Sequence, residues 1–196
     1  MEKIKKTTGE ITGMHIEPID LDESFVDFSA RFAALAGTTV LLSGGDLDCA
    51  RYHILGAKPW LKFAGRNRMM TITSADQTVE VTADPFDTLR LIINSFQLND
   101  LGLAPSGLPP SIAAGLFGYL SYALTDVLEK LPRTSVDDLR LPHICFFAPS
   151  IIVVHDKSND STRLCIPVRN LAGQSSLDDD LNFFKQILAA EPPAKG

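Results

Sequence analysis

The chain has 196 residues, of which 45% are apolar and 21% are charged, the composition of a folded globular protein. Its formal net charge is −6 and its basic residues are scattered, which argues against a nucleic-acid binder, because phosphate contacts need clustered lysine and arginine. No apolar run is long enough to cross a bilayer, and residues 1–13 lack the apolar core of a secretory signal. We therefore expect a cytoplasmic protein with no nucleic-acid or membrane partner.

The N-terminal part of the chain predicts a strand, a helix and a second strand. Strand patterns cover residues 14–20 and the β-branched, apolar residues 38–43. Between them, residues 23–37 repeat apolar side chains at three- and four-residue steps, which is typical of a helix with one buried stripe. Asp22 or Ser24 would cap this helix.

A meander of short strands and a helix follow. Short apolar runs separated by Gly, Pro, Asn, Asp and Ser predict antiparallel hairpins. These runs cover residues 51–57, 59–65, 68–74 and 78–83. Over residues 84–98 the apolar period becomes helical, with Asp84 as the N-cap and Pro85 at the first helical position.

The C-terminal half adds further strands and closes with a helix. After a Pro- and Gly-rich connection we expect a glycine-interrupted strand, a short helix, a strand pair joined by a polar turn, and an amphipathic helix. These cover residues 112–124, 125–132, 143–156 with 161–168, and 176–190. Strands do not alternate regularly with helices, so we predict an α+β fold with mainly antiparallel sheets packed as a sandwich and flanked by helices. Residues 1–190 would form this domain and residues 191–196 a linker.

Cysteine and histidine positions predict neither a disulfide framework nor a metal site. Cys49, Cys145 and Cys165 show no CxxC spacing and cannot all pair within the chain. Cys145 and Cys165 stand in apolar runs and are expected to be buried free thiols. The four histidines, at positions 15, 53, 143 and 155, share no metal-ligand spacing.

The sequence assembles no nucleophile, base and oxyanion donor, so we predict no catalytic residue. The Ser43-Gly44-Gly45 turn lacks a phosphate-binding pattern and precedes a strand instead of a helix. Ser43 is not in a GxSxG elbow, and although His53 could neighbour it across a hairpin, such a pair at strand ends is usually structural. Asp178 to Asp180 fall in the first turn of a helix, where the dipole favours negative charge.

Three stretches, in order along the chain, carry a family resemblance. Residues 40–63 (VLLSGGDLDCARYHILGAKPWLKF) are similar to a strand ending in Leu-Leu-Glu-Ser, then Arg-Tyr-Ser-x-Leu-Gly, a small residue and Pro. Residues 113–132 are similar to a Gly-Gly-x-x-Gly-Tyr-x-x-Tyr stretch that ends in Glu-x-Leu-Pro. Residues 137–156 are similar to an Asp-Asp-x-x-x-Pro-Asp run, an aromatic strand and Asp-His, here His155-Asp156. Together these stretches resemble component I of the chorismate-utilising amidotransferase enzymes.

The resemblance implies the N-terminal domain of anthranilate synthase component I or of aminodeoxychorismate (para-aminobenzoate) synthase component I. Glu129 to Pro132 with Asp137-Asp138 leans towards the para-aminobenzoate branch. In this family the chorismate and magnesium sites lie in a larger C-terminal domain, and a glutamine amidotransferase subunit supplies ammonia. The resemblance thus implies a domain that is inactive alone and holds no cofactor, with magnesium in an absent catalytic domain. The alternative is a stand-alone small-molecule-binding or interaction domain.

The resemblance also implies an amino-acid site. In anthranilate synthases the Leu-Leu-x-Ser strand end helps to bind tryptophan, the feedback inhibitor, and some para-aminobenzoate enzymes hold tryptophan in the same place. Carried over, Leu42, Ser43 and Gly44 would line the pocket, with Arg51 or His53 nearby. The glutamate usual before this serine is Leu42 here, which removes a carboxylate able to pair with the ligand's ammonium. A plain β-turn at Ser43-Gly44-Gly45 is the alternative interpretation.

Overall fold

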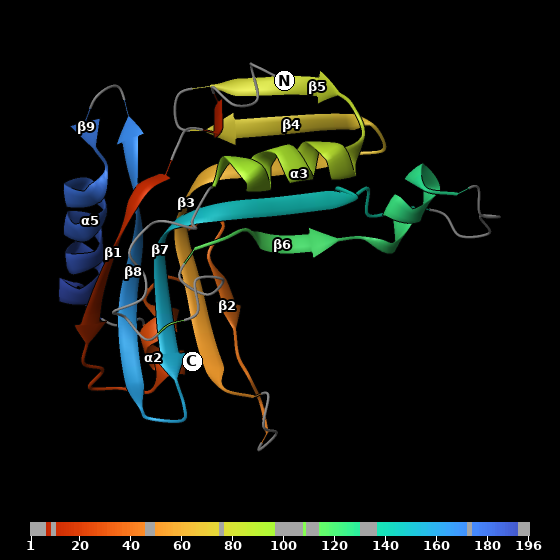
Figure 1. The fold of residues 1–196 in the computed structure, drawn as a ribbon. Helices are drawn as coiled ribbons and strands as arrows, with labels where there is room; N and C mark the ends of the chain where they lie inside the picture. Colours follow the sequence, from red (N-terminus) through yellow and green to blue (C-terminus); the bar gives the residue numbers. More distant parts are fainter. Residues whose placement is uncertain are drawn as a thin grey trace.

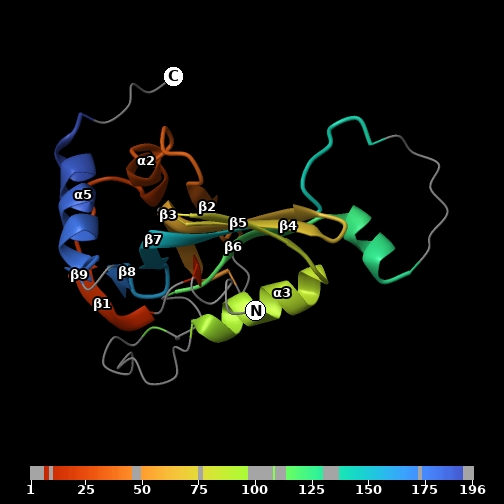
Figure 2. The ribbon, with the colours of Figure 1, turned by 90° about the horizontal axis from the view of Figure 1, so that it is seen from above.

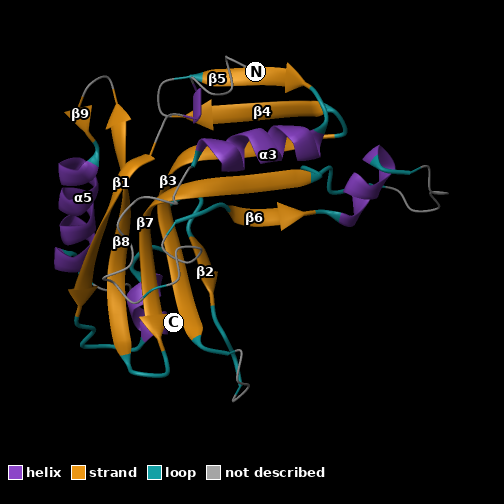
Figure 3. Cartoon of the chain, in the orientation of Figure 1, coloured by secondary structure: helices purple, strands orange, loops and turns teal. Residues whose placement is uncertain are grey.

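An antiparallel sheet with helices packed on it forms the body of the protein. The computed structural model describes residues 7–8, 11–45, 50–74, 77–96, 108, 114–129, 137–171 and 174–191. The strands are β1 (Ile11–Ile19), β2 (Thr39–Leu41), β3 (Tyr52–Arg66), β4 (Met69–Ser74), β5 (Thr78–Thr82), β6 (Phe117–Leu120), β7 (Ile144–Asp156), β8 (Ser161–Leu171) and β9 (Gln174–Ser175). The helices are α2 (Phe25–Ala30), α3 (Pro85–Ser95), the 3-10 helix η2 (Tyr122–Val127) and α5 (Leu177–Ala189). Figure 3 distinguishes these helices from the strands.

The described strands run in the order β1-β8-β7-β3-β4-β5, with β2 added to β3, β6 to β7 and β9 to β8. Each of these pairs is antiparallel. The expected α+β class with antiparallel strands is therefore confirmed. Instead of two separate sheets, the strands form one continuous sheet that changes direction along β3 and β7 (Figure 1).

The change of direction occurs where two prolines face each other. Pro59 of β3 pairs with Pro149 of β7, and the register shifts between Pro59 and Leu61. Proline has no N–H for the ladder, and Lys58 just before it has a φ of 51°, so neither strand can continue straight. The two strands expected over residues 51–57 and 59–65 are the two parts of the single bent strand β3.

The bend divides the sheet into two halves. We call the part with β1, β8, β2 and residues 52–57 of β3 the lower half, and the part with β4, β5, β6 and residues 61–66 of β3 the upper half (Figure 1). In the view of Figure 2, α2 and α3 lie on opposite sides of the strands.

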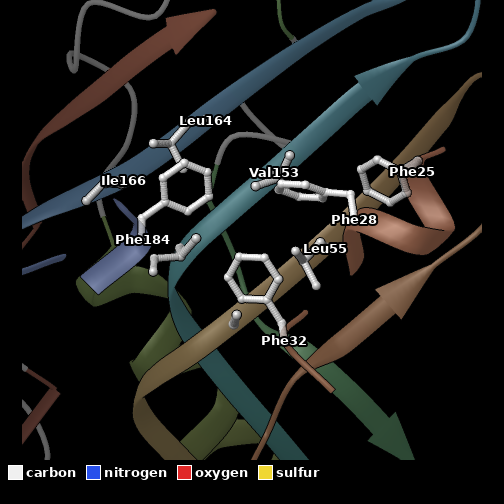
Figure 4. Packing of buried hydrophobic residues seen from close by; sticks show 10 residues of the cluster. Phe25, Phe28, Phe32, Leu55, Val153, Leu164, Ile166 and Phe184 are labelled. Carbon is white, nitrogen blue, oxygen red and sulfur yellow. The ribbon is translucent and has the colours of Figure 1, made fainter. Parts of the chain in front are cut away.

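The lower half is buried on both faces, which explains its unbroken apolar runs. On β7, Ile151 and Val153 join one apolar cluster, while the alternate residues Ile152 and Val154 join another. The first cluster, which we call the sealed face, packs α2 and α5 onto the sheet (Figure 4). Its buried members are Phe25, Phe28, Phe32, Leu55, Ala57, Ile151, Val153, Leu164, Ile166 and Phe184.

The upper half is covered by α3. This helix begins as predicted, because the Asp84 carboxylate accepts bonds from the amides of Phe86 (2.9 Å) and Asp87 (3.2 Å), and Pro85 follows the cap. Its Ile92 is fully buried against the strands. Ser24, one of the two caps expected for the preceding helix, accepts from the Asp27 amide at 3.1 Å.

A buried ionic cluster ties α5 to the bend. Asp180, only 1% exposed, accepts a bond from Lys58 Nζ at 2.8 Å and another from the Arg169 guanidinium. Arg169 also lies 5.1 Å over the ring of Trp60. Asp180 was interpreted from the sequence as an acid favoured by the helix dipole, whereas it is also the shared partner of two cations.

Other predictions have mixed outcomes. Cys145 and Cys165 are buried and free, as predicted, and burial raises the pKa of the Cys165 thiol to about 12. Of the strand expected over 112–124, residues 112–113 lie outside the described residues, and within 114–124 Phe117–Leu120 pairs with β7 before η2 begins. Among the described residues no helix is long and apolar enough to cross a membrane. The linker at residues 191–196 lies almost entirely outside the described residues.

Candidate functional site

The segment after β2 is held by side chains instead of a ladder. The β2–β3 pairing ends at Leu41 opposite Ile54. Two residues later, the Ser43 amide donates to Nδ1 of His53 at 3.1 Å, and the Ser43 hydroxyl donates to the carbonyl of Tyr52 at 2.8 Å. The structure thus brings Ser43 and His53 together. The bond to the imidazole comes from the backbone, so the two are not arranged as a nucleophile and its base.

A lysine that the sequence analysis did not single out reaches the same segment. Lys157 Nζ donates to the carbonyls of Ser43 (3.2 Å) and Gly45 (3.4 Å). Its own amide donates to the Arg51 carbonyl at 3.0 Å, so the β7–β8 turn stands beside the start of β3. Gly45 has a φ of 73°, in the left-handed region that favours glycine.

Arg51 is occupied by a carboxylate. Its Nε and Nη2 donate to the two oxygens of Asp156 at 2.9 and 2.6 Å, a bidentate pair. The amide and hydroxyl of Ser158 also donate to Asp156, at 3.0 and 2.7 Å. The hydrogen bonds from Arg51, above all, hold the pKa of the Asp156 carboxyl well below its usual range. The Arg51 guanidinium therefore stabilises the β7–β8 turn through Asp156 and is not directed towards a ligand.

His53 lies in an aromatic stack. Its ring centroid is 5.9 Å from that of His155, with an interplanar angle of 12°, and 5.5 Å from that of Phe25. Burial lowers the pKa of His53, and the nearby charges of Lys157 and His155 act in the same direction. The neutral imidazole is thus the form that the fold favours.

A cavity of about 470 Å³ lies where the two halves of the sheet meet, between β2 and β6. We call it the open corner. Its lining comprises Thr39, Leu41, Ile54, Ala114, Gly115, Leu116, Phe117, Gly118, Tyr119, Phe146 and Phe147. None of the five predicted residues (Leu42, Ser43, Gly44, Arg51 and His53) is in this lining, but Leu41 is. The predicted strand end therefore adjoins the cavity instead of forming its walls.

The β6 side of this cavity was not predicted from the sequence. The available signal was Gly118, since a glycine inside a strand often marks a close backbone approach. A Cβ on Gly118 would overlap the Cys145 carbonyl oxygen, so this glycine lets β6 lie against β7 and presents Phe117 and Tyr119 at the corner.

The open corner suits an apolar or aromatic group. Among the described residues of its lining no side chain is charged, and the polar groups are the hydroxyls of Thr39 and Tyr119 and the backbone. Within the described residues, no group of three or more His, Cys, Asp or Glu side chains could hold a metal ion.

Comparison with known proteins gives relatives of a single name. No family model matches the chain. It is 31% identical over 165 residues to anthranilate synthase component 1 of Cereibacter sphaeroides, covering 80% of this chain and 32% of that protein. It is 28% identical over 146 residues to the protein of that name from Mycolicibacterium smegmatis, covering 73% of this chain and 27% of that protein.

The fold has a solved counterpart. Anthranilate synthase component I from Streptococcus pneumoniae matches 83% of this chain and 34% of its own, with a TM-score of 0.55 and 20% identity, which supports a shared fold alone. The chain spans about a third of the length of the curated relatives it matches. It is therefore similar, over most of its length, to one part of anthranilate synthase component I.

Proposed function

We propose that this chain is a non-catalytic domain of a chorismate-utilising synthase component I. The observation that carries the proposal is the similarity of 80% of the chain to about a third of a protein named anthranilate synthase component 1. The absence of a nucleophile–base pair at Ser43 and His53 agrees with a supporting role.

The larger protein would replace a chorismate hydroxyl with ammonia delivered by a glutamine amidotransferase subunit. In the anthranilate branch pyruvate is then eliminated. Magnesium, which the family uses, does not fit the described part of this chain, because no cluster of carboxylate or imidazole donors is present there. The chain's contribution is structural support and ligand binding.

The anthranilate branch is favoured over the aminodeoxychorismate branch, because the relatives that match carry the anthranilate synthase name. The test is an assay of the protein in its full encoded length with chorismate, an ammonium salt and Mg²⁺, with products separated by chromatography. We expect anthranilate. Aminodeoxychorismate as the product would place the protein in the other branch, and no chorismate consumption would support a stand-alone binding domain.

Exposed apolar side chains around η2 give the domain a surface to pack on a catalytic domain. Tyr122 is 83% exposed, Leu128 69% and Leu139 72%. The segments that bear them are joined where the Ser121 amide donates to the His143 carbonyl at 2.8 Å. Where exposed apolar side chains form one contiguous patch, they mark a surface that another part of a protein covers.

We further propose that the open corner and the adjoining strand end hold L-tryptophan. The cavity of about 470 Å³ lies within the range of roughly 300–1,000 Å³ of small-molecule sites, and its aromatic walls suit an indole. The ligand's charged groups would point to residues 42–45, where backbone polar groups and the Lys157 ammonium are concentrated.

The missing glutamate makes a sharp test of this site. Leu42 is 51% exposed, so Leu42→Glu should leave the fold intact while it supplies the carboxylate found in the family. A charge-assisted bond to the ligand's ammonium is worth about 1.5–3 kcal/mol, so calorimetry should show at least tenfold tighter tryptophan binding. Leu42→Gln is the matched neutral control and should tighten binding less. Equal affinities for the three proteins would remove the site from this strand end.

A further inference from the structure

Residues 42–45 form a short arm beyond the β2–β3 ladder, and three side-chain bonds fix it at Ser43. They are the bonds from the Ser43 amide to His53 Nδ1, from the Ser43 hydroxyl to the Tyr52 carbonyl, and from Lys157 Nζ to the Ser43 carbonyl. Of these three, only the first uses a histidine ring as its partner. The bond to His53 does depend on protonation.

We propose that His53 is a positioning residue of the open corner: its unprotonated Nδ1 holds the Ser43 amide, and protonation of the ring releases the 42–45 arm. A backbone N–H can only donate, so Nδ1 must offer a lone pair, and the ring proton of the neutral form must be on Nε2. Protonation places a second donor against the Ser43 amide and abolishes the bond.

The surroundings oppose the charged ring. From the β7–β8 turn, the Lys157 ammonium faces His53, and from β7 the His155 imidazole stacks on it. From α2, the ring of Phe25 covers it. The neighbouring Arg51 and Asp156 are paired with each other. A proton on His53 therefore adds charge beside a lysine inside an aromatic stack.

The sign of the pH effect follows from this environment. The pKa of His53 is lowered by burial first, and then by Lys157 and His155. The arm is thus held above the ordinary histidine pKa of about 6.5 and is released only at a lower pH. Lys157, which donates to the Ser43 and Gly45 carbonyls, limits the movement of the arm while His53 charges.

The consequence for ligand binding rests on the proposed function. Leu41 lines the cavity and Ser43 follows two residues later, so release of the arm loosens the β2 wall of the open corner. As the pH is lowered, the affinity for tryptophan and the protection of the arm's backbone amides against hydrogen exchange should fall together.

Hydrogen exchange with mass spectrometry tests the release without any ligand. The protein in its full encoded length is compared with three variants at matched pH, from about pH 8 to about pH 5, so that intrinsic exchange cancels. His53→Asn keeps an acceptor oxygen near the Nδ1 position but does not titrate. His53→Ala removes the acceptor. His155→Asn changes the stacked partner, whose Nδ1 is bonded to Thr162 Oγ1 at 3.0 Å instead of to the arm.

At about pH 8 we expect residues 42–45 to be equally protected in the wild type, His53→Asn and His155→Asn, and to exchange about fivefold to tenfold faster in His53→Ala. As the pH falls below the ordinary histidine pKa of about 6.5, the wild type and His155→Asn should approach the exchange of His53→Ala, while His53→Asn stays protected. The proposal is overturned if the wild type follows His53→Asn throughout, if His53→Ala is as protected as the wild type, or if His155→Asn abolishes the transition.

A tryptophan titration of the same proteins separates the two proposals. If the arm is released by acid but tryptophan does not bind at any pH, the positioning role of His53 stands and the tryptophan site fails. If tryptophan binds and the arm is not released by acid, the tryptophan site stands and the positioning role of His53 fails.

Discussion

The sealed face and the open corner are built on the same two strands and have opposite characters. The sealed face joins α2 and α5 to β3, β7 and β8 through ten buried residues, seven of which have no exposed surface within rounding: Phe32, Leu55, Ala57, Ile151, Val153, Leu164 and Ile166. The open corner is lined in part by two short strands: β2, which has three residues, and β6, which has four. Its Leu41 is 50% exposed and its Tyr119 42%.

The difference shows how one strand can serve stability and binding at once. Side chains alternate across a strand, so Leu55 of β3 belongs to the sealed face while Ile54 lines the open corner. Rigid strands with one sealed face support a site made from their other face better than a loop would. Changes on the sealed face should therefore cost stability, and changes at the corner should affect binding.

The largest effect is expected on the sealed face. Phe32 is fully buried, with its ring 5.5 Å from that of Phe28 and 6.1 Å from that of Phe184. Phe32→Ala should lower the free energy of unfolding by about 3–5 kcal/mol, measured by urea denaturation. Val26→Ala, at a residue 57% exposed, is the control and should change it by less than about 0.5 kcal/mol. Similar losses in both variants would mean that the face is not sealed.

The ionic cluster behind the bend should come next. Asp180→Asn keeps the shape of the side chain but leaves the buried guanidinium of Arg169 without its counter-charge, at a cost of about 3 kcal/mol. Asp179→Asn alters the exposed neighbour in the same helical turn and should have little effect. Equal unfolding free energies for the two variants would show that the helix dipole, instead of the pairing, determines the role of Asp180.

A change at the close approach of β6 to β7 should have a smaller effect. Gly118→Ala places a Cβ against the Cys145 carbonyl and the Phe146 backbone, so overpacking should cost about 1–3 kcal/mol and displace β6. Gly115→Ala is the matched control, because a Cβ there meets nothing within 4 Å. Chemical denaturation measures the cost. A Gly118→Ala protein as stable as Gly115→Ala would contradict the register of β6.

The Arg51–Asp156 pair should appear as a pH dependence. The pKa of Asp156 is held below its usual value, so the carboxylate stabilises the fold above the unfolded-state pKa of about 3.9, and this stabilisation is lost as pH falls. Asp156→Asn should be less stable at neutral pH and should show a flatter acid limb in denaturation curves recorded against pH. Asp160→Asn, at a carboxylate 96% exposed in the same turn, should keep the acid limb of the wild type.

The smallest effect on stability is expected at the open corner. Leu41→Trp should change the free energy of unfolding by less than about 0.5 kcal/mol, because the residue is half exposed. The larger ring should nevertheless fill part of the cavity. A stability loss comparable to that of Phe32→Ala would make the corner part of the core.

Local signals in the sequence predicted most of the helices and strands. The features that were not predicted depend on pairing between residues far apart in the chain. Asp84 and Pro85 start α3 by short-range chemistry, so the sequence was sufficient there. The bend required Pro59 to face Pro149, which no local pattern reveals. The same limit applies to the site: the contact between Ser43 and His53 followed from a hairpin, whereas Phe117 reaches the corner only through the pairing of β6 with β7.

The most direct measurement is calorimetric titration of L-tryptophan into the protein in its full encoded length, with the wild type beside Leu41→Trp. If the open corner receives the indole while the sealed face only supports it, the wild type should give a saturable heat that Leu41→Trp lacks, with both proteins equally stable. A wild type that gives no heat, or a Leu41→Trp variant that binds as tightly as the wild type, would contradict this account.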